Sequence, residues 1–172
     1  MQAAGLAALL AGGVPVAASA AEMSVRDLQV IARAIAFMTP PPSGTAEIGI
    51  VYPGASDPGK QEAERIVAAF GTGLRAGSLT LTARAMPLEG IASGPVALLL
   101  TSAALPHAAT AATAVAGKGV LTVAVEPSAI EGGRVVMTVR SEPRVEILVN
   151  RVAAQGAGVG FSAAFRMMIQ ER

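Results

Sequence analysis

The hydrophobic positions follow a helical period first and a strand-like pattern next. Over residues 25–38, apolar side chains recur at three- and four-residue spacing, which is typical of a helix with one buried face. Ser24 stands where the cap of that helix belongs, and the prolines from Pro40 onward end the pattern. Ala46–Tyr52 is a short run with high β-propensity and predicts a strand. The chain therefore opens with a helix followed by a strand.

The alternation of helices and strands continues toward the C-terminus. Asp57 and Pro58 predict a helix start, with the carboxylate as cap and proline in the first turn, and this helix runs to about Phe70. Ser102 is predicted to cap another helix that ends near Ala116. Further strands are predicted at Leu79–Met86, Pro95–Thr101, Val120–Val125, Gly133–Arg140 and Arg144–Asn150, and a last helical region, interrupted by Gly156, Gly158 and Gly160, is predicted through Phe161–Gln170.

This order of elements predicts an α/β fold. Strands that alternate with helices form a mainly parallel sheet with helices on both faces, here a single three-layer lobe. The strands at 133–140 and 144–150 are separated by only three residues, so we expect a late antiparallel hairpin. No polar linker divides the chain, and residues 21–172 are therefore predicted to be one domain.

Residues 1–20 resemble a signal peptide. An uncharged apolar stretch precedes Ala18-Ser19-Ala20, the small-residue pattern of a cleavage site, so the mature chain is expected to begin at Ala21. No Lys or Arg precedes the apolar stretch, which suggests that the true start lies upstream of Met1. No later segment has the length of a membrane span. We therefore expect an exported, periplasmic protein without a membrane span after removal of the signal.

Composition excludes several chemistries. The chain has no cysteine and one histidine, so disulfides, thiol chemistry and cysteine-based metal sites are impossible. Its net charge of +1 gives no basic face for nucleic acid, and its 3% aromatic content argues against a carbohydrate cleft. His107 lacks a nucleophile motif nearby, and the glycines at 156–160 lack dinucleotide-loop spacing. We predict no catalytic residue, no metal and no cofactor.

Two places are candidates for binding. In parallel α/β sheets, ligands bind beyond the carboxyl ends of strands, where strand order reverses. The acidic residues Glu62 and Glu64 are expected on a solvated helix face instead. For ligand binding we single out Tyr52, Ser56, Asp57, Thr101 and Ser102. For contact with a partner protein we single out the apolar C-terminal residues Phe161, Phe165, Met167 and Met168, with Ile169 beside them, since methionine adapts well at contact surfaces.

The C-terminal half also resembles a known family. Its motifs are the strand Val120–Val123 after Gly117-Lys118-Gly119, the acidic Gly-Gly turn at 131–133, the strand ending at Asn150, and Ala157-Gly158 before the last elements. Their order is similar to that of the YfiR-like family of exported periplasmic domains, and the opening helix, ending Phe37-Met38-Thr39-Pro40, also fits. The tryptophan that usually precedes this proline is absent, and so are the cysteines of many members.

The resemblance implies a regulatory protein. Well-known members of the YfiR-like family bind the periplasmic domain of a membrane-bound diguanylate cyclase and restrain it, so a membrane-anchored signalling protein is the expected partner. Since this chain has no cysteine, thiol-based regulation does not carry over to it. A homodimer is compatible with the sequence as well. The alternative is a single-lobe solute-binding protein related to transporter receptors, and an exported hydrolase ranks third.

Overall fold

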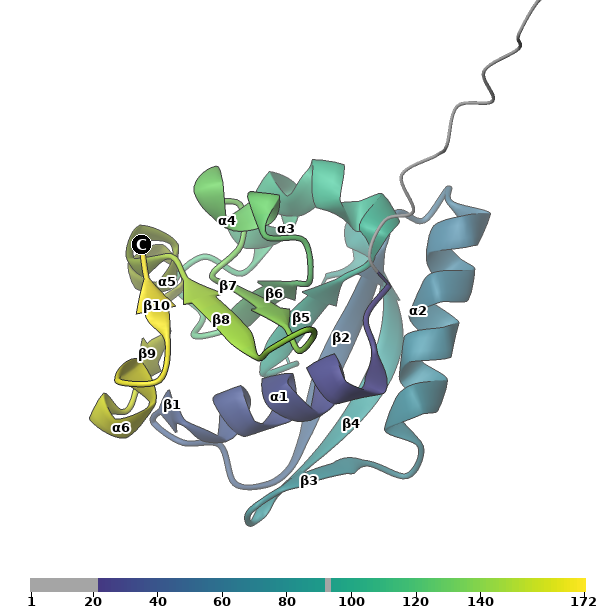
Figure 1. The fold of residues 1–172 in the computed structure, drawn as a ribbon. Coiled ribbons are helices and arrows are strands. Elements are labelled where there is room, and N and C mark those ends of the chain that lie inside the picture. Colours follow the sequence, from purple (N-terminus) through teal and green to yellow (C-terminus); the bar gives the residue numbers. More distant parts are fainter. Residues whose placement is uncertain (1–21, 92–93) are drawn as a thin grey trace, which may run out of the picture.

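An eight-stranded sheet forms the centre of the computed structural model, which describes residues 22–91 and 94–172 (Figure 1). The strand order is β10-β8-β7-β6-β5-β2-β4-β3, and β2, β4, β5, β6 and β7 run parallel. The predicted leader and its cleavage site lie outside the described residues. The strands are β2 (Gly44–Tyr52), β3 (Leu74–Ala76), β4 (Leu79–Pro87), β5 (Ala97–Leu100), β6 (Leu121–Ala124), β7 (Met137–Arg140), β8 (Glu146–Val149) and β10 (Gln170–Glu171).

Helices cover both faces of this sheet, which confirms the predicted three-layer α/β architecture. The helices α1 and α2 pack on one face, whereas η2, α3 and α4 pack on the other. The late hairpin is also confirmed, since β8 runs antiparallel to β7. The remaining elements are α1 (Val25–Ala36), β1 (Met38–Thr39), α2 (Asp57–Phe70), η1 (Leu88–Gly90), η2 (Ser102–His107), α3 (Ala108–Ala114), α4 (Ser128–Glu131), α5 (Arg151–Ala157), β9 (Gly160–Phe161) and α6 (Ala163–Arg166).

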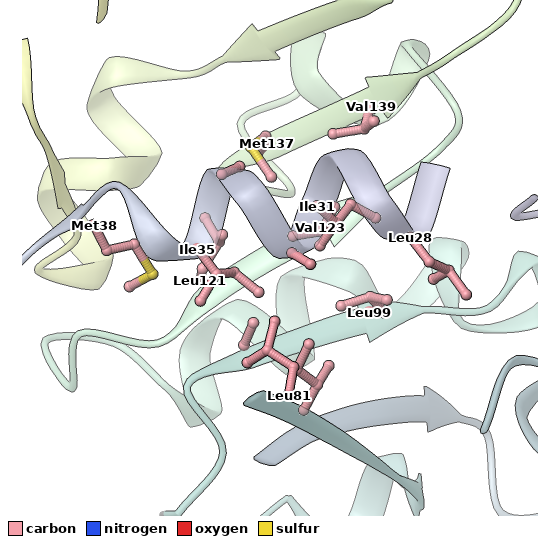
Figure 2. Close-up of a cluster of buried hydrophobic side chains, with 14 of the residues drawn as sticks. Leu28, Ile31, Ile35, Met38, Leu81, Leu99, Leu121, Val123, Met137 and Val139 are labelled. Carbon is pink, nitrogen blue, oxygen red and sulfur yellow. The ribbon is translucent and has the colours of Figure 1, made fainter. Parts of the chain in front are cut away.

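The apolar stripe of α1 fills the centre of the first face. Leu28, Ile31 and Ile35 are fully buried, as the three- and four-residue spacing predicted. Figure 2 shows their side chains directed at the strands, which present residues such as Leu121 and Val123 to the helix. Each buried aliphatic side chain of this size contributes about 1.5–3 kcal/mol to folding. This contact therefore anchors the N-terminal helix to the middle of the sheet.

The second face is covered less completely. Small residues such as Ala104, Ala108 and Ala111 bring η2 and α3 close to β5 and β6. No helix covers β4 there, because the described part of the connection from β4 to β5 contains only the short turn η1. On that side of β4, Arg84 pairs with Glu47 at 2.9 Å, and this hydrogen bond, with the attraction of the carboxylate charge, raises the pKa of Arg84. The uncovered part of this face is therefore polar at Arg84 and Glu47, whereas Met86 further along β4 is buried.

Two predicted helix caps are wrong in detail. Ser56, not Asp57, caps α2: its Oγ accepts a hydrogen bond from Gly59 N–H at 3.1 Å, and Asp57 is the first helical residue. Ser102 does not cap an α-helix, because the segment begins as the 3-10 helix η2 and becomes α-helical only at Ala108. Pro106 explains the division, since proline supplies no N–H for the helical ladder.

The C-terminal region also differs from the prediction. A helix through Phe161–Gln170 is wrong: one helical turn, α6, lies between the two-residue strands β9 and β10. Gly158, at φ +73°, ends α5 in the left-handed conformation, so the chain turns back instead of continuing as a helix. Earlier in the chain, β7 begins only at Met137 and not at Gly133, although Val135 and Val136 are buried. The short helix α4 precedes it and was not predicted.

Asp27 ties the start of α1 to the end of β7. Ser24 caps this helix as predicted, and the Asp27 carboxylate accepts hydrogen bonds from Ser24 N–H at 2.8 Å and Ser24 O–H at 2.7 Å. Its other oxygen accepts one from the buried Ser141 N–H at 2.8 Å. The side chain is almost fully buried with both oxygens hydrogen-bonded. One carboxylate thus completes the capping box of α1 and fixes the helix to the hairpin.

Ile31→Ala should lower the free energy of unfolding by about 2–5 kcal/mol, because it leaves a cavity under the centre of α1. Val25→Ala is the control, since Val25 is 54% exposed on the same helix and its truncation should cost no more than about 0.5 kcal/mol. Chemical denaturation measures both. Equal losses in the two variants would contradict this account of the core.

Asp27→Ala should lower the free energy of unfolding by about 1–3 kcal/mol, because it removes the carboxylate half of the capping box around Ser24 and leaves the Ser141 N–H without an acceptor in the protein. The exposed neighbour Arg26 provides the matched control, Arg26→Ala. Native-state hydrogen exchange should show faster exchange at the Ser141 amide in the Asp27 variant alone. Unchanged exchange at that amide would exclude the proposed tie.

Candidate functional site

The C-terminal residues form one corner of the molecule together with the end of α1 (Figure 1). The short strand β9 pairs antiparallel with β1, with Met38 opposite Phe161, and Ser162 N–H donates to Phe37 C=O at 2.9 Å. The chain then passes through α6 and returns to the sheet as β10, parallel to β8. This corner is therefore attached both to the first helix and to the edge of the main sheet.

Three of the four phenylalanines in the chain gather at this corner. The ring of Phe165 stacks on Phe37 at 5.5 Å between centroids and contacts Phe161 at 5.0 Å in a tilted arrangement. Phe165 is buried, Phe161 is half-buried and Phe37 is 37% exposed. Because aromatic pairs stabilise by about 0.5–1.5 kcal/mol beyond simple burial, this cluster holds α6 against the end of α1.

An open cleft of about 780 Å³ lies beside the aromatic cluster. Its walls come from α5, β9, α6 and β10, with the end of β8 and Thr39. Guanidinium groups dominate its polar lining, and the other polar side chains are a carboxylate, an amide and a hydroxyl. The lining residues are Thr39, Val149, Arg151, Val152, Ala154, Gln155, Val159, Gly160, Phe161, Arg166, Glu171 and Arg172. Such a lining favours binding of anionic groups next to apolar ones.

Glu171 holds two of the arginines in place. Its Oε1 accepts a hydrogen bond from Arg166 Nε at 3.0 Å, and its Oε2 lies 3.6 Å from Arg151 Nε. The arginine side chains are 53% and 69% exposed, and the carboxylate is 25% exposed. Exposed ion pairs of this kind contribute about 0–1 kcal/mol each. The three groups are therefore oriented without being locked together.

The predicted partner-contact residues divide between surface and core. Met167 is 89% exposed and Met168 is 61% exposed, and both directly follow Arg166 of the cleft. Phe161 lines the cleft, whereas Phe165 lies in the core and supports the others. Val152, on the α5 side of the cleft, is 79% exposed, and nothing in its local sequence pattern marks it as a surface residue. Partner contact at these residues stays a prediction.

The residues predicted to bind a ligand lie at the carboxyl ends of β2 and β5, but internal hydrogen bonds engage several of them. The Thr101 hydroxyl is buried and donates to Val51 C=O at 2.9 Å. Ser102 donates to the Glu62 carboxylate from both its N–H and its hydroxyl, each at 3.0 Å to Oε1. Glu62 is thus half-buried and bound to η2, not on a solvated face as expected.

The first turn of α2 leaves little room for a ligand at the carboxyl ends of β2 and β5. A Cβ atom on Gly59 would lie 3.0 Å from Ala103 Cβ, so α2 and η2 are in close contact. Ser56 uses its hydroxyl as the cap of α2, while Tyr52 is half-buried and Asp57 is exposed. Ligand binding by these residues stays a prediction, with few free polar groups to support it.

Other candidates from the sequence occupy ordinary structural positions. His107 is exposed at the end of η2. Gly158 approaches Gly117 so closely that an added Cβ would lie 3.5 Å from its backbone. In the part of the chain that the structure describes, no three His, Asp or Glu side chains cluster as metal ligands, and no helix is long and apolar enough to cross a membrane.

Comparison with known proteins supports both the fold and the resemblance. The family model DUF4154, described as YfiR/HmsC-like, matches residues 29–168 and confirms the predicted family. No curated protein matches the chain.

Two solved structures share the fold. One is the ABC domain in complex with L-Trp from Streptococcus pneumonia, with a TM-score of 0.56 at 15% identity over 84% of this chain and 60% of that one. The other is a conserved domain protein from Vibrio cholerae O1 biovar El Tor, with a TM-score of 0.57 at 11% identity over 86% of this chain and 59% of that one. This chain thus spans about three fifths of each, and the likeness is one of fold alone.

Glu171→Gln should change the free energy of unfolding by less than about 1 kcal/mol, because the ion pairs that it removes are largely exposed. Asp27→Ala, which affects a buried carboxylate, is the contrasting variant. Thermal and chemical unfolding measure the difference. A loss from Glu171→Gln as large as that from Asp27→Ala would mean that the cleft carboxylate is a structural element of the fold.

Proposed function

Because this chain belongs to the YfiR/HmsC-like family, we propose that it binds the periplasmic domain of a membrane-bound signalling protein and regulates that protein without catalysing a reaction itself. The family is one of periplasmic regulators. By its resemblance to well-known members, the partner would be a diguanylate cyclase that this protein restrains. The observation that carries the proposal is the exposed apolar surface at the C-terminal corner, beside the arginine cleft.

Exposed methionines suit a binding surface of this kind. Met167 and Met168 expose most of their side chains in a segment held by the buried Phe165, and Val152 exposes another apolar side chain nearby on the cleft wall. An exposed apolar cluster costs solubility and commonly marks a site of protein contact. Methionine is flexible and polarisable, so it adapts to the surface of a partner.

Such a surface can regulate a sensor simply by binding one of its conformations more tightly than the other. A protein that binds the inactive conformation of a membrane sensor more tightly than the active one shifts the sensor toward the inactive state. No catalytic group is required for this, and the polar lining of the cleft, arginines with one carboxylate, an amide and a hydroxyl, fits binding rather than chemistry. Export to the periplasm, through the predicted leader at 1–20, would place this surface on the same side of the membrane as the sensor domain.

Met167→Lys combined with Met168→Lys should abolish capture of the membrane partner, because charges replace the apolar contact. Val145→Lys is the control, since Val145 is 49% exposed on the β7–β8 turn. The purified protein is used to capture partners from solubilised membranes of the organism that makes it, and cyclic di-GMP is measured in cells carrying each variant. We expect the double variant to unfold at the same temperature as the parent, to lose the membrane partner and to raise cyclic di-GMP.

Three outcomes would count against the proposed function. The first is recovery of no integral membrane protein by the parent chain. The second is equal loss of capture in the Val145 control. The third is a change of oligomeric state in the double variant without any change in membrane capture, which would assign the methionines to a homodimer contact.

Solute binding is the second candidate, because a domain of similar fold was solved with L-Trp bound. This chain spans 60% of that protein's length. Thermal-shift measurements with amino acids, anions and metal ions test it. A stabilising solute would favour this candidate, and a flat response throughout would exclude it for the compounds tested.

A further inference from the structure

The cleft at the C-terminal corner presents more positive than negative side chains. Arg151, Arg166 and Arg172 are among its lining residues, and Glu171 is the one residue among them with an acidic side chain. The chain as a whole has a net charge of only +1, so this local gathering of arginines is not a consequence of a generally basic surface. An excess of positive side chains of this kind attracts negatively charged groups to the cleft.

The arginines are already arranged around a carboxylate. Arg166 and Arg151 approach Glu171 through their Nε atoms, at 3.0 and 3.6 Å, so the terminal nitrogens of each guanidinium remain as further donors. Both side chains are more than half exposed, and exposed ion pairs exchange partners at little cost. An incoming carboxylate can therefore take the place of Glu171 on these two guanidinium groups.

The remaining surface of the cleft is apolar. Phe161, Val152 and Val159 line it between the charged groups, and Val152 is largely exposed. A simple inorganic anion would leave these side chains in water, whereas a chain segment carrying both carboxylates and apolar side chains would cover them. The physical match is therefore an acidic peptide with apolar residues between its acidic ones.

An extended conformation fits the neighbouring sheet edge. The strand β10 contributes Glu171 to the cleft and is the outermost strand of the described sheet at that end. An edge strand presents backbone N–H and C=O groups on its outer side, which another extended chain can pair with. Backbone pairing along β10 would lay the acidic side chains of an extended segment beside the arginines.

We propose that the arginine cleft receives an acidic, extended segment of the partner's periplasmic domain, with carboxylates of that segment replacing Glu171 on Arg151 and Arg166. This inference rests on the proposed function, and it adds the chemistry of the partner. The exposed methionines supply apolar contact beside the cleft, while the cleft selects for acidic sequence. Since a recess accepts a chain segment more readily than a flat membrane does, a peptide is favoured over a lipid surface.

The test uses the full exported chain and two synthetic peptides with blocked ends. In one peptide glutamates alternate with leucines, and in the other glutamine replaces every glutamate. Fluorescence anisotropy measures their affinities at low and high salt. We expect the acidic peptide to bind at least about tenfold more tightly than the glutamine peptide at low salt, and to weaken as salt rises.

Variants locate the binding in the cleft. Arg151→Glu with Arg166→Glu should remove the preference for the acidic peptide, whereas Arg75→Glu with Arg144→Glu, two exposed arginines outside the cleft, makes the same charge change and should keep most of it. Glu171→Gln should tighten binding of the acidic peptide several-fold, because the arginines lose their internal competitor. Thermal unfolding confirms that each variant is folded, and the Glu171 variant tests the proposal through a gain that mere structural damage does not produce.

Several outcomes would overturn the inference. They are absence of binding by the acidic peptide, equal binding of the glutamine peptide, equal losses in the control arginine pair, or no gain from Glu171→Gln. Tighter binding of anionic phospholipid vesicles or of an oligonucleotide through the same arginines would assign the cleft to another anion and would also overturn it. Failure of the proposed function is distinguishable, because membrane capture and its loss in the Met167 and Met168 variant do not depend on the peptide measurements.

Discussion

The structure depends on the burial of one helix face against the centre of the sheet. Leu28, Ile31 and Ile35 hold α1 across the strands, and both ends of the helix then organise other parts of the chain. At its start, Asp27 fixes the end of β7 through the Ser141 N–H. Beyond its end, β1 pairs with β9, and the Phe37 ring stacks on Phe165. The C-terminal corner is therefore positioned by a helix at the other end of the sequence, and a loss of packing under α1 would reach the candidate binding surface through this connection.

Small and large side chains are distributed differently between the sheet core and the C-terminal corner. In the described core, the sheet is covered mainly by aliphatic residues and alanine, which allows α3 and η2 to lie close to the strands. Three of the four phenylalanines are instead concentrated at the corner, where β1, β9 and β10 have only two residues each and provide few backbone hydrogen bonds. Aromatic packing stabilises a region that its short strands alone would leave weak. This division explains how a rigid core can carry a binding surface with exposed methionines and easily exchanged ion pairs.

The central elements could be predicted from sequence because each follows a local rule. The stripe of α1, the cap at Ser24, the span of α2 to Phe70 and the apolar run of β5 need no distant contact to be recognised. The errors arise where a distant contact decides. Ser102 looks like a helix cap, yet its hydroxyl donates to the Glu62 carboxylate from α2. Phe161 becomes a strand residue because Met38 pairs with it. Apart from Phe161, the cleft could not be found from the sequence, since Arg151, Arg166 and Glu171 have no shared spacing and meet only when β10 joins β8.

A partner could bind at the C-terminal corner without lowering the stability of the fold. Surface ion pairs around Glu171 contribute little to stability, so a competing carboxylate can replace them while the aromatic cluster and the tie from β9 to β1 stay intact. The carboxylate of Asp27 is the opposite case, because it is 7% exposed and the loss of its backbone and side-chain donors would leave a buried charge without partners. The chain thus places one acidic residue where exchange is costly and the other where exchange is easy. Of the two, only the second has the physical properties that reversible recognition of a partner requires.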